Sequence, residues 1–399
     1  MKRAIVLVVD SLGVGYMEDV SKCRPQDMGA NTFKHILDKE REIQIPNFEK
    51  LGINKILKHE NLRDIDNIGS YGVLNLGHYG ADSFVGHQEI MGTKPKKPLM
   101  KSFSYFRDEV IERLKNEGHK VIIPEGDKSY ILVDNLVVVA DNIETDYGQI
   151  FNVTAPLDYI SFDKVLEIGQ IVRSVVKVNR VIALGGENVS IEQILNSIEE
   201  REDGLIGVNS PKSGVYNKGY ISRHLGYGIN PENQITTILI KNNYEVSLIG
   251  KMQDVIECEN ANRTPAVDTE KVMKSIIESM DNMENGIIVA TVQETDLAGH
   301  AQDVKKYAEK LMTVDNYIGY IINRMEDEDI LFITADHGNV PTIGFSQHTR
   351  EKTFLLVYGK KLKNVDLGER ATLSDIAASI SDYFKVEKTE NGSSFMGLL

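Results

Sequence analysis

Cysteine is scarce in this chain of 399 residues. Only Cys23 and Cys258 occur, they lie far apart, and neither belongs to a C-x-x-C pair. The sequence therefore argues against a disulfide framework and against a zinc site built on thiolates. The same scarcity favours a reducing compartment, and we expect the protein in the cytoplasm.

Long apolar runs are also lacking. None approaches the roughly 20 residues that a membrane-spanning helix needs, so we expect no such helix. The N-terminus starts with basic residues like a signal peptide, but its apolar run stops at Asp10 and no cleavage site of small residues follows. We interpret residues 3–9 as the first strand of the fold.

The chain lacks a positive net charge: its formal charge is −14 at pH 7. Nucleic acids and anionic membranes need a basic face, so we expect neither as a partner. A local basic pocket for a small phosphorylated substrate remains compatible with this charge. The oligomeric state stays open.

Composition and periodicity indicate a soluble α/β protein. The apolar content is 41% and the charged content 26%, and the length suggests two or three domains. Short β-branched runs alternate with amphipathic segments, which predicts a mostly parallel sheet covered on both faces. We expect strands at residues 286–290, 330–333 and 354–358, and helices at residues 83–91, 303–325 and 372–384. Thr372 and Asp375 have the spacing of a capping box.

The middle of the chain differs from its ends. Candidate strands at residues 120–123, 136–139 and 180–184 surround one clear helix at residues 162–176, which predicts an inserted α+β domain. The segment GTKPKKP at residues 92–98 is a plausible hinge, because its prolines and lysines disfavour a helix or a buried strand. The predicted domains are a core of residues 1–100 and 229–399 and an insert of residues 101–228.

Two motifs rich in ligand-type side chains each follow an apolar run. TADHGN at residues 334–339 follows the run 330–333, and DLAGH at residues 296–300 follows the run 286–290. Aspartate and histidine at the ends of buried strands are typical of metal sites.

Two further residues fit this pattern. Asp10 ends the first strand, and His348 lies eleven residues after His337. Alone, Asp10 is equally explained as a turn cap, and His348 as a hydrogen-bonded structural histidine. The ordered set favours a dinuclear metal site, because the carboxyl ends of parallel strands meet at one edge of a sheet.

Six motifs occur in an order that resembles one enzyme family. They are DSLGVG at residues 10–15, GANTFKH at 29–35, DSFVGHQEIMG at 82–92, IGK at 249–251, DHG at 336–338 and QHTRE at 347–351. Together with GSSF at residues 392–395 they resemble bacterial phosphopentomutase, a member of the alkaline phosphatase superfamily. Residues 101–228 resemble it only loosely. The resemblance implies an alkaline-phosphatase-like core with a mostly parallel sheet and an inserted α+β cap domain.

The resemblance also implies a ligand set for two divalent cations, with manganese favoured. Two such cations can hold a phosphoryl group and neutralise the leaving oxygen. By resemblance, one metal would be held by Asp296, His300 and His348. The other would be held by Asp10, Asp336, His337 and the Ser83 hydroxyl. The spacing of Asp296 and His300 is one residue tighter than in phosphopentomutases and closer to that of cofactor-independent phosphoglycerate mutase.

Ser83 is the candidate nucleophile. At a helix N-terminus its oxygen would meet unpaired backbone N–H groups, which favour an alkoxide or a phosphoryl group. Phosphopentomutases carry a phosphorylated threonine at this position, and serine is chemically competent there. Asp82 and Ser83 could instead only cap the helix. His87 is either close to the ligands or a helix residue that faces the core.

Three residues are candidates for substrate binding. Arg223 has a setting similar to that of a family arginine and could clamp a phosphate with two hydrogen bonds, or it could be a solvated surface arginine. Asp146 lies near the family's sugar-contacting aspartate, and Lys251 belongs to the IGK motif.

The leading interpretation is a metal-dependent phosphomutase, an isomerase that moves a phosphoryl group between the 1- and 5-positions of a pentose phosphate through a phosphoserine. One alternative is a metal-dependent phosphatase, or a mutase for another phosphorylated metabolite. The other is a metal-binding protein without catalysis.

Overall fold

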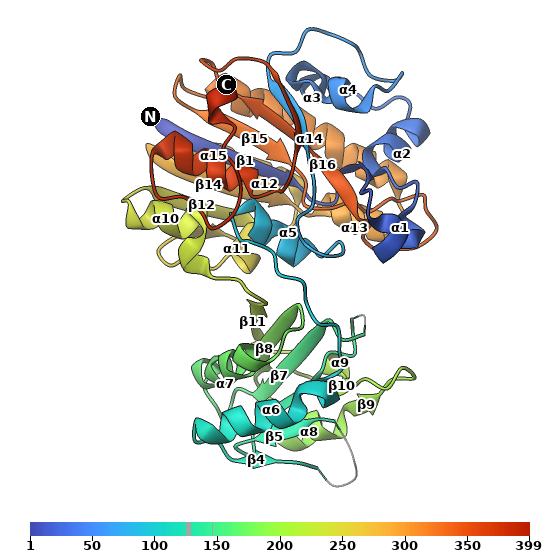
Figure 1. Cartoon of the computed structure of the whole chain (residues 1–399), viewed down its shortest axis with the longest axis vertical. Helices are drawn as coiled ribbons and strands as arrows, with labels where there is room; N and C mark the ends of the chain where they lie inside the picture. Colours follow the sequence, from blue (N-terminus) through green and yellow to red (C-terminus); the bar gives the residue numbers. More distant parts are fainter. Residues whose placement is uncertain (125–128, 146) are drawn as a thin grey trace. The chain divides into compact units, whose positions relative to one another are not determined.

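The computed structural model describes residues 1–124, 129–145 and 147–399. Its contacts divide the chain into two compact units (Figure 1). Unit 1 comprises residues 1–95 and 230–399, and unit 2 comprises residues 96–229. Asp146, one of the predicted substrate residues, lies outside the described residues.

Unit 1 is built on a mixed sheet that is mostly parallel. The strand order is β13-β12-β14-β1-β15-β16-β3-β17, with β2 paired to β16. Strands β13, β12, β14, β1 and β15 run parallel, as do β3 and β17, whereas β16 is antiparallel to β15, β3 and β2. The strands are β1 (Lys2–Val9), β2 (Gly13–Tyr16), β3 (Ser70–Leu74), β12 (Glu245–Gly250), β13 (Asn262–Thr264), β14 (Asn285–Val292), β15 (Ile330–Thr334), β16 (Glu351–Tyr358) and β17 (Asp366–Arg370).

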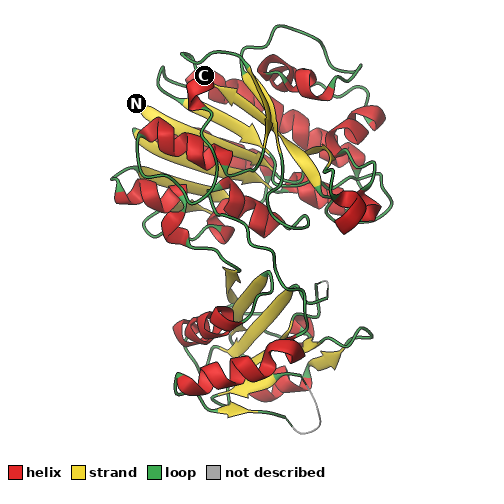
Figure 2. Cartoon of the chain, in the orientation of Figure 1, coloured by secondary structure: helices red, strands yellow, loops and turns green. Residues whose placement is uncertain are grey.

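Both faces of this sheet are apolar. Successive residues of a strand point to opposite sides of the sheet, and here successive residues are apolar. In β1, Ile5 and Leu7 pack into one hydrophobic core, and Val6 and Val8 pack into the other. Helices cover both faces (Figure 2). The first core contains residues of α2 (Thr32–Lys39), α3 (Pro46–Leu51), α4 (Ile53–Leu57), α12 (Thr269–Asn282), α13 (Glu294–His300) and α14 (Val304–Arg324). The second contains residues of α5 (Ser83–Ile90), α10 (Ile235–Lys241), α11 (Lys251–Val255) and α15 (Asp375–Phe384).

Short elements complete unit 1. They are α1 (Val20–Cys23) and the 3-10 helices η1 (Pro25–Asp27), η2 (Pro231–Asn233) and η3 (Met396–Leu398). The predicted strands of this unit and the helices α5 and α14 are found within a few residues of their predicted bounds. The predicted capping box is wrong, because α15 begins at Asp375, after Ser374, without a side-chain cap. The Thr372 hydroxyl donates instead to the Glu89 carboxylate.

Unit 2 contains a second sheet with the order β11-β8-β7-β6-β5-β4. Its strands β7 and β8 are parallel and the other neighbours antiparallel. The strands are β4 (Val121–Ile122), β5 (Ile131–Val133), β6 (Val137–Asp141), β7 (Ile150–Pro156), β8 (Arg180–Gly186) and β11 (Ile221–Gly226); β9 (Ile198–Glu200) and β10 (Ile206–Val208) form a separate pair. The helices are α6 (Phe103–Asn116), α7 (Phe162–Val175), α8 (Ile191–Asn196) and α9 (Ser210–Ser213).

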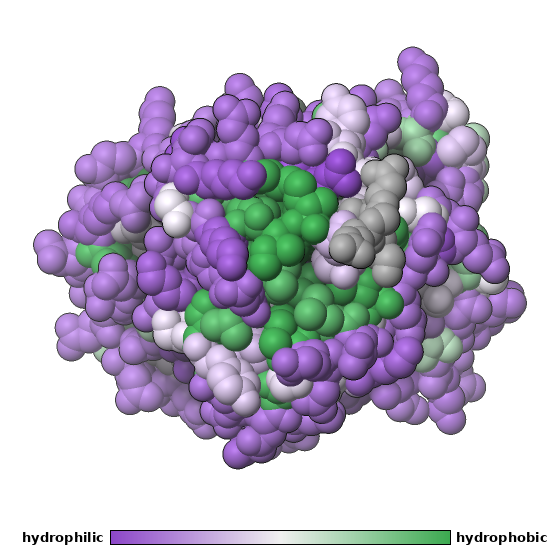
Figure 3. Space-filling model, turned by 90° about the horizontal axis from the view of Figure 1, so that it is seen from below, coloured by the Kyte–Doolittle hydropathy of each residue, from purple (hydrophilic) through white to green (hydrophobic). Residues whose placement is uncertain are grey.

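The helix content of unit 2 exceeds the prediction of one clear helix. Helix α6 packs Phe103, Val110 and Leu114 against one face of the sheet together with α7. Some apolar surface of this unit faces solvent: Ile122 and Ile123 are 37% and 51% exposed. Figure 3 shows an apolar patch with a polar rim on one face of the unit.

Among the described residues, every helix is too short or too polar to serve as a membrane span.

Candidate metal centre

Three parallel strands end where the predicted ligands begin. Val8 of β1 lies between Thr291 of β14 and Thr334 of β15 in the sheet. Asp10 follows β1, Asp336 follows β15, and α13 follows β14. Because the carboxyl ends of parallel strands meet at one edge, acidic side chains far apart in the sequence come together there.

The first group of ligand-type residues is Asp10, Asp336 and His337. Each offers an atom within 4.8 Å of the others, and all three side chains are fully buried. His337 Nε2 lies 3.2 Å from Asp336 Oδ2 and 3.5 Å from Asp10 Oδ1. Ser83 Oγ lies 2.5 Å from Asp336 Oδ2 and 3.5 Å from Asp10 Oδ1. The structure thus brings together the residues predicted for one cation.

The second group is Asp296, His337 and His348, which also offer atoms within 4.8 Å of one another. His300 Nε2 is 3.0 Å from His348 Nε2 and 3.3 Å from Asp296 Oδ2. The imidazole rings of His337 and His348 are stacked with centroids 3.9 Å apart. The predicted set for the other cation is therefore assembled, and His337 lies within reach of both groups.

The hydrogen bonds of three histidines test whether these groups fit a cation. Each of three histidines donates its Nδ1–H to a backbone carbonyl at 2.7–3.0 Å. The pairs are His300 with Ser346, His337 with Gly338, and His348 with Ala81. The Nε2 lone pairs then face carboxylate oxygens or another Nε2. His337 Nε2 is buried without a hydrogen-bond partner among the described residues. Lone pairs that converge in this way need a proton or a cation between them, and a backbone-anchored Nδ1–H is the usual support of a metal-binding histidine.

The charges of the centre shift its pKa values strongly. Burial raises the pKa of Asp10 to about 7, and the Asp336 carboxylate adds to the rise. Burial alone would lower the pKa of His337, but the carboxylates of Asp336 and Asp296 raise it to about 9. Burial would raise the pKa of Asp296, but the adjacent imidazoles of His300 and His348 hold it well below its ordinary value. The centre therefore stabilises positive charge, the property that a cation site requires.

Ser83 is the first residue of α5 and faces this centre. Asp82 is the N-cap, and its side chain accepts from the Val85 amide. The Ser83 hydroxyl is thus not the cap, and it contacts Lys251 Nζ at 2.6 Å. Lys251 Nζ also lies 2.8 Å from Asp10 Oδ2. Burial would lower the pKa of Lys251, but Asp10 and the other carboxylates raise it, so this lysine is a cation beside Ser83.

Two residues of the QHTRE motif support the centre, and the sequence did not reveal their roles. The Arg350 guanidinium donates to the carbonyls of His78 and Gly80, in the loop that leads to Ser83. The buried Glu351 carboxylate accepts from the amide and the hydroxyl of Thr32. The motif itself was the only signal, because these partners lie hundreds of residues away.

Arg223 lies in unit 2, on β11. It is half-buried, and its Nε is buried without a hydrogen-bond partner among the described residues. Arg223 is therefore not a fully solvated surface arginine, and its role as a phosphate clamp stays a prediction.

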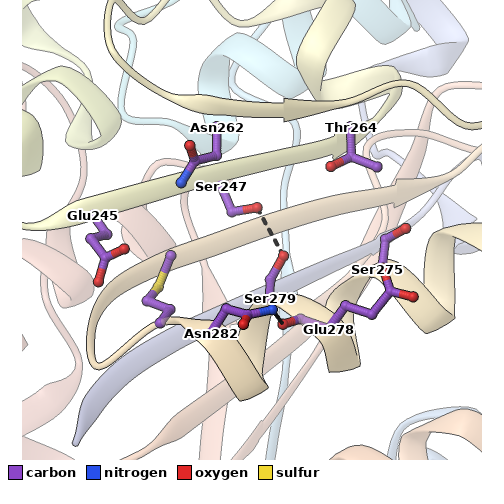
Figure 4. Close-up of a pocket in the computed structure, with 9 residues that line it drawn as sticks. Glu245, Ser247, Asn262, Thr264, Ser275, Glu278, Ser279 and Asn282 are labelled. Atoms are coloured by element: carbon purple, nitrogen blue, oxygen red, sulfur yellow. Dashed lines mark hydrogen bonds between the residues drawn. The ribbon is translucent and has the colours of Figure 1, made fainter.

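A polar cavity of about 220 Å³ lies elsewhere in unit 1 (Figure 4). It is lined by residues of β12, β13 and α12, and Ser247 and Ser279 share a hydrogen bond of 3.0 Å there. Glu245, another lining residue, begins β12, whereas Lys251 directly follows the end of this strand. The cavity thus lies toward the amino end of β12, away from the edge that carries the metal centre.

Comparison with known proteins places this chain in a family. The model of the metalloenzyme superfamily matches residues 2–388. A phosphopentomutase of Alkaliphilus oremlandii is 30% identical over 99% of this chain and 98% of its own length. This chain belongs to the metalloenzyme superfamily and, within it, to the phosphopentomutase family. A phosphopentomutase of Caldanaerobacter subterraneus is 31% identical with the same coverage.

A solved structure supports the fold. A phosphoglycerate mutase of Leishmania mexicana, determined at low cobalt concentration, matches 99% of this chain and 97% of its own with a TM-score of 0.51. At 12% identity this match shows a shared fold. The predicted α/β fold of the alkaline-phosphatase type is confirmed.

Membership of the phosphopentomutase family confirms the predicted class of the protein. The full-length relatives show that the chain is an enzyme, an isomerase-type phosphotransferase that works as a metal-dependent phosphomutase. The superfamily and the two ligand groups together indicate that it binds divalent metal.

Proposed function

We propose that this protein interconverts the 1- and 5-phosphates of a pentose, with Ser83 as the carrier of the transferred phosphoryl group. The observation that carries the proposal is the setting of Ser83 Oγ. It lies at the N-terminus of α5, 2.5 Å from Asp336 and 2.6 Å from Lys251. Relatives named phosphopentomutase over the full length supply the substrate class.

Two divalent cations fit the two ligand groups, and we propose manganese for both. Asp296, His300 and His348 would hold one cation. Asp10, Asp336, His337 and the Ser83 hydroxyl would hold the other. Carboxylates and imidazoles suit manganese, zinc and magnesium, and we propose manganese on the ground of the resemblance described in the sequence analysis. When bound, the cations supply positive charge that stabilises a transferring phosphoryl group.

The residues of the chain supply the remaining chemistry. Phosphorylated Ser83 gives its phosphoryl group to the free hydroxyl of a sugar monophosphate: the Ser83 Oγ–P bond breaks, a sugar O–P bond forms, and the proton of the sugar hydroxyl ends on the departing Ser83 Oγ. The sugar bisphosphate then turns and returns its other phosphoryl group to Ser83. Lys251 lies where it can contact this group, which supports its predicted role in substrate binding.

Unit 2 is proposed to bind the sugar phosphate. Arg223 could hold a phosphate through two parallel hydrogen bonds, because its guanidinium Nε lacks another partner among the described residues. Asp146 stays a predicted sugar contact. A small phosphorylated sugar as the substrate agrees with the cytoplasmic location that we propose.

The reaction can be followed by phosphorus NMR with Mn²⁺, ribose 5-phosphate or deoxyribose 5-phosphate, and a trace of sugar bisphosphate. We expect the 1-phosphate to form until equilibrium, and Ser83→Ala to abolish its formation. Release of inorganic phosphate without the 1-phosphate would identify a phosphatase. Conversion of a phosphoglycerate but of no pentose phosphate would assign another mutase, and either result would refute the proposal.

A further inference from the structure

His87 lies one helical turn after Ser83 in α5 and is fully buried. Its Nδ1 is 2.7 Å from the Ser83 carbonyl oxygen and 3.1 Å from Asp336 Oδ2. Its Nε2 is 2.9 Å from Thr291 Oγ1. The sequence left open whether this residue belongs to the metal centre or to the core, and these contacts tie it to the centre.

The neighbours of the ring determine where its proton lies. A carbonyl oxygen and a carboxylate oxygen can only accept, so Nδ1 must carry the proton that it donates to Ser83 and Asp336. The Thr291 hydroxyl can donate, and it satisfies the lone pair of Nε2. His87 therefore needs neither a charge nor a metal to complete its hydrogen bonds, in contrast to His337.

The backbone around His87 is held close to Asp336. Thr291 lies in β14, where Val8 of β1 is its partner on one side and Gly250 of β12 on the other. In α5, a Cβ atom added to Gly86 would lie 2.9 Å from the Asp336 carbonyl oxygen. Helix α5 thus rests directly on Asp336, the second residue after β15, and Thr291 connects the ring of His87 to the middle of the sheet.

We propose that His87 is a positioning residue. It holds the Asp336 carboxylate and the first turn of α5 in the geometry that binds the cation and presents Ser83, and Thr291 sets the orientation and the tautomer of its ring. The proposal deepens the phosphomutase function proposed above and rests on it for its effect on turnover. Residues behind metal ligands typically change metal affinity or activity by roughly 10–100-fold when replaced.

Two pairs of variants separate the parts of this arrangement. Asparagine can place an N–H donor where His87 has Nδ1, whereas glutamine can place its amide only where His87 has Nε2. Valine matches the shape of Thr291 without the hydroxyl, and serine keeps the hydroxyl without the methyl group. We expect His87→Asn and Thr291→Ser to keep most of this positioning effect, and His87→Gln and Thr291→Val to lose it.

The first measurement uses the metal alone. Chelator-treated protein is titrated with Mn²⁺, and the free ion is followed by electron paramagnetic resonance. We expect His87→Gln to weaken binding by roughly 10–100-fold and His87→Asn by much less. Thr291→Val should weaken binding in the wild-type background but add nothing in the His87→Asn background, because the asparagine no longer reaches Thr291.

The second measurement determines which ring nitrogen of His87 carries the proton. Nitrogen NMR of metal-free protein with labelled histidine should show a protonated Nδ1 and an unprotonated Nε2 for His87. Thr291→Val should move the Nε2 signal toward that of a nitrogen without a hydrogen bond. In sugar phosphate assays, Thr291→Val should lower kcat and leave KM unchanged, because it acts on Ser83 rather than on substrate binding.

Wild-type Mn²⁺ affinity in His87→Gln and Thr291→Val, or a proton on Nε2 in the wild type, would overturn the proposal. If His87→Gln fails to fold, the Mn²⁺ affinity of Thr291→Val still tests the proposal, because valine has the shape of threonine. If the affinities follow the predicted order but the enzyme isomerises no sugar phosphate, the positioning role stands and the proposed substrate is wrong.

Discussion

At the residue scale, three histidines of the metal centre direct their hydrogen-bond donors away from it and their lone pairs toward it. The Nδ1–H groups of His300, His337 and His348 all donate to backbone carbonyls. Ser83 and Lys251 bring a hydroxyl and a cation to the same carboxylates, Asp336 and Asp10. This division of donors and acceptors suits a site that holds cations and receives a phosphoryl group.

Arg223 provides a test at this scale. If its guanidinium holds a substrate phosphate, Arg223→Ala should raise KM by roughly tenfold or more, and Arg223→Lys should recover only part of the loss because an ammonium cannot form the two parallel hydrogen bonds. Steady-state kinetics with the sugar phosphate measures both. Arg113→Ala, in an exposed ion pair with Glu117 of the same unit, is the matched control and should leave KM unchanged. Equal KM values in all three variants would remove Arg223 from the substrate site.

The ligand-type residues could be predicted from the sequence because each follows a recognisable apolar run or lies in a motif. The roles of Arg350, Glu351 and Thr291 could not be predicted. Their partners are distant in the sequence, and only the folded sheet brings them to the loop before Ser83, to Thr32 and to His87.

At the element scale, several strands and the helices α5, α7 and α14 could be predicted from the sequence, because β1 is a continuous apolar run and α14 repeats its apolar residues at helical spacing. Helix α6 was missed although Phe103, Val110 and Leu114 have helical spacing. The start of α15 was wrong for a physical reason: local capping rules cannot foresee that the Thr372 hydroxyl donates to Glu89, 283 residues away in the sequence.

Glu89 joins α5 to the segment before α15, and its replacement tests this connection. Its buried carboxylate accepts from the amides of Gly77, His78 and Leu373, from His78 Nδ1 and from the Thr372 hydroxyl. Glu89→Gln should lower the free energy of unfolding by about 3 kcal/mol at pH 7, because an amide presents a donor to donors. Urea unfolding measures the loss. Glu309→Gln, on the exposed side of α14, should change nothing measurable.

The pH dependence of this loss has a definite sign. Burial would raise the pKa of Glu89, but His78 and Thr372 lower it below the ordinary value of 4.5. The stability that ionised Glu89 contributes is therefore full above pH 4.5 and disappears as the pH falls through the lower pKa of the folded state. The difference between wild type and Glu89→Gln should shrink below pH 4.5. A difference that is constant from pH 7 to pH 4 would contradict the account.

At the scale of the whole molecule, two sheets with separate hydrophobic cores make up the chain. The sequence indicated an insertion through the change in composition and through the lysine-proline segment at residues 92–98, and the contacts divide the chain inside that segment. The antiparallel placement of β16 between β15 and β3 could not be predicted, because strand order depends on long-range pairing.

Metal removal should change the stability of unit 1 and leave unit 2 unaffected. The buried carboxylates of Asp10, Asp336 and Asp296 repel one another without cations, and binding to the folded state adds stability by linkage. We expect a chelator to abolish activity, to lower the melting temperature, and to speed hydrogen exchange at the amides after β1, β14 and β15. Exchange in unit 2 should not change, which makes this unit the internal control. An unchanged melting temperature and full turnover after chelation would contradict a metal centre.

Ser83 is proposed to carry the phosphoryl group between two positions of the sugar, and a chase of labelled enzyme follows this transfer. Enzyme labelled with radioactive phosphate on Ser83 is mixed with unlabelled pentose phosphate and Mn²⁺ and is quenched at short times. We predict that the label leaves Ser83 at least as fast as kcat and enters sugar phosphates, with peptide mass spectrometry locating it on Ser83 before the chase. Label that stays on the protein during turnover, or that leaves only as inorganic phosphate, would show that Ser83 is not the carrier.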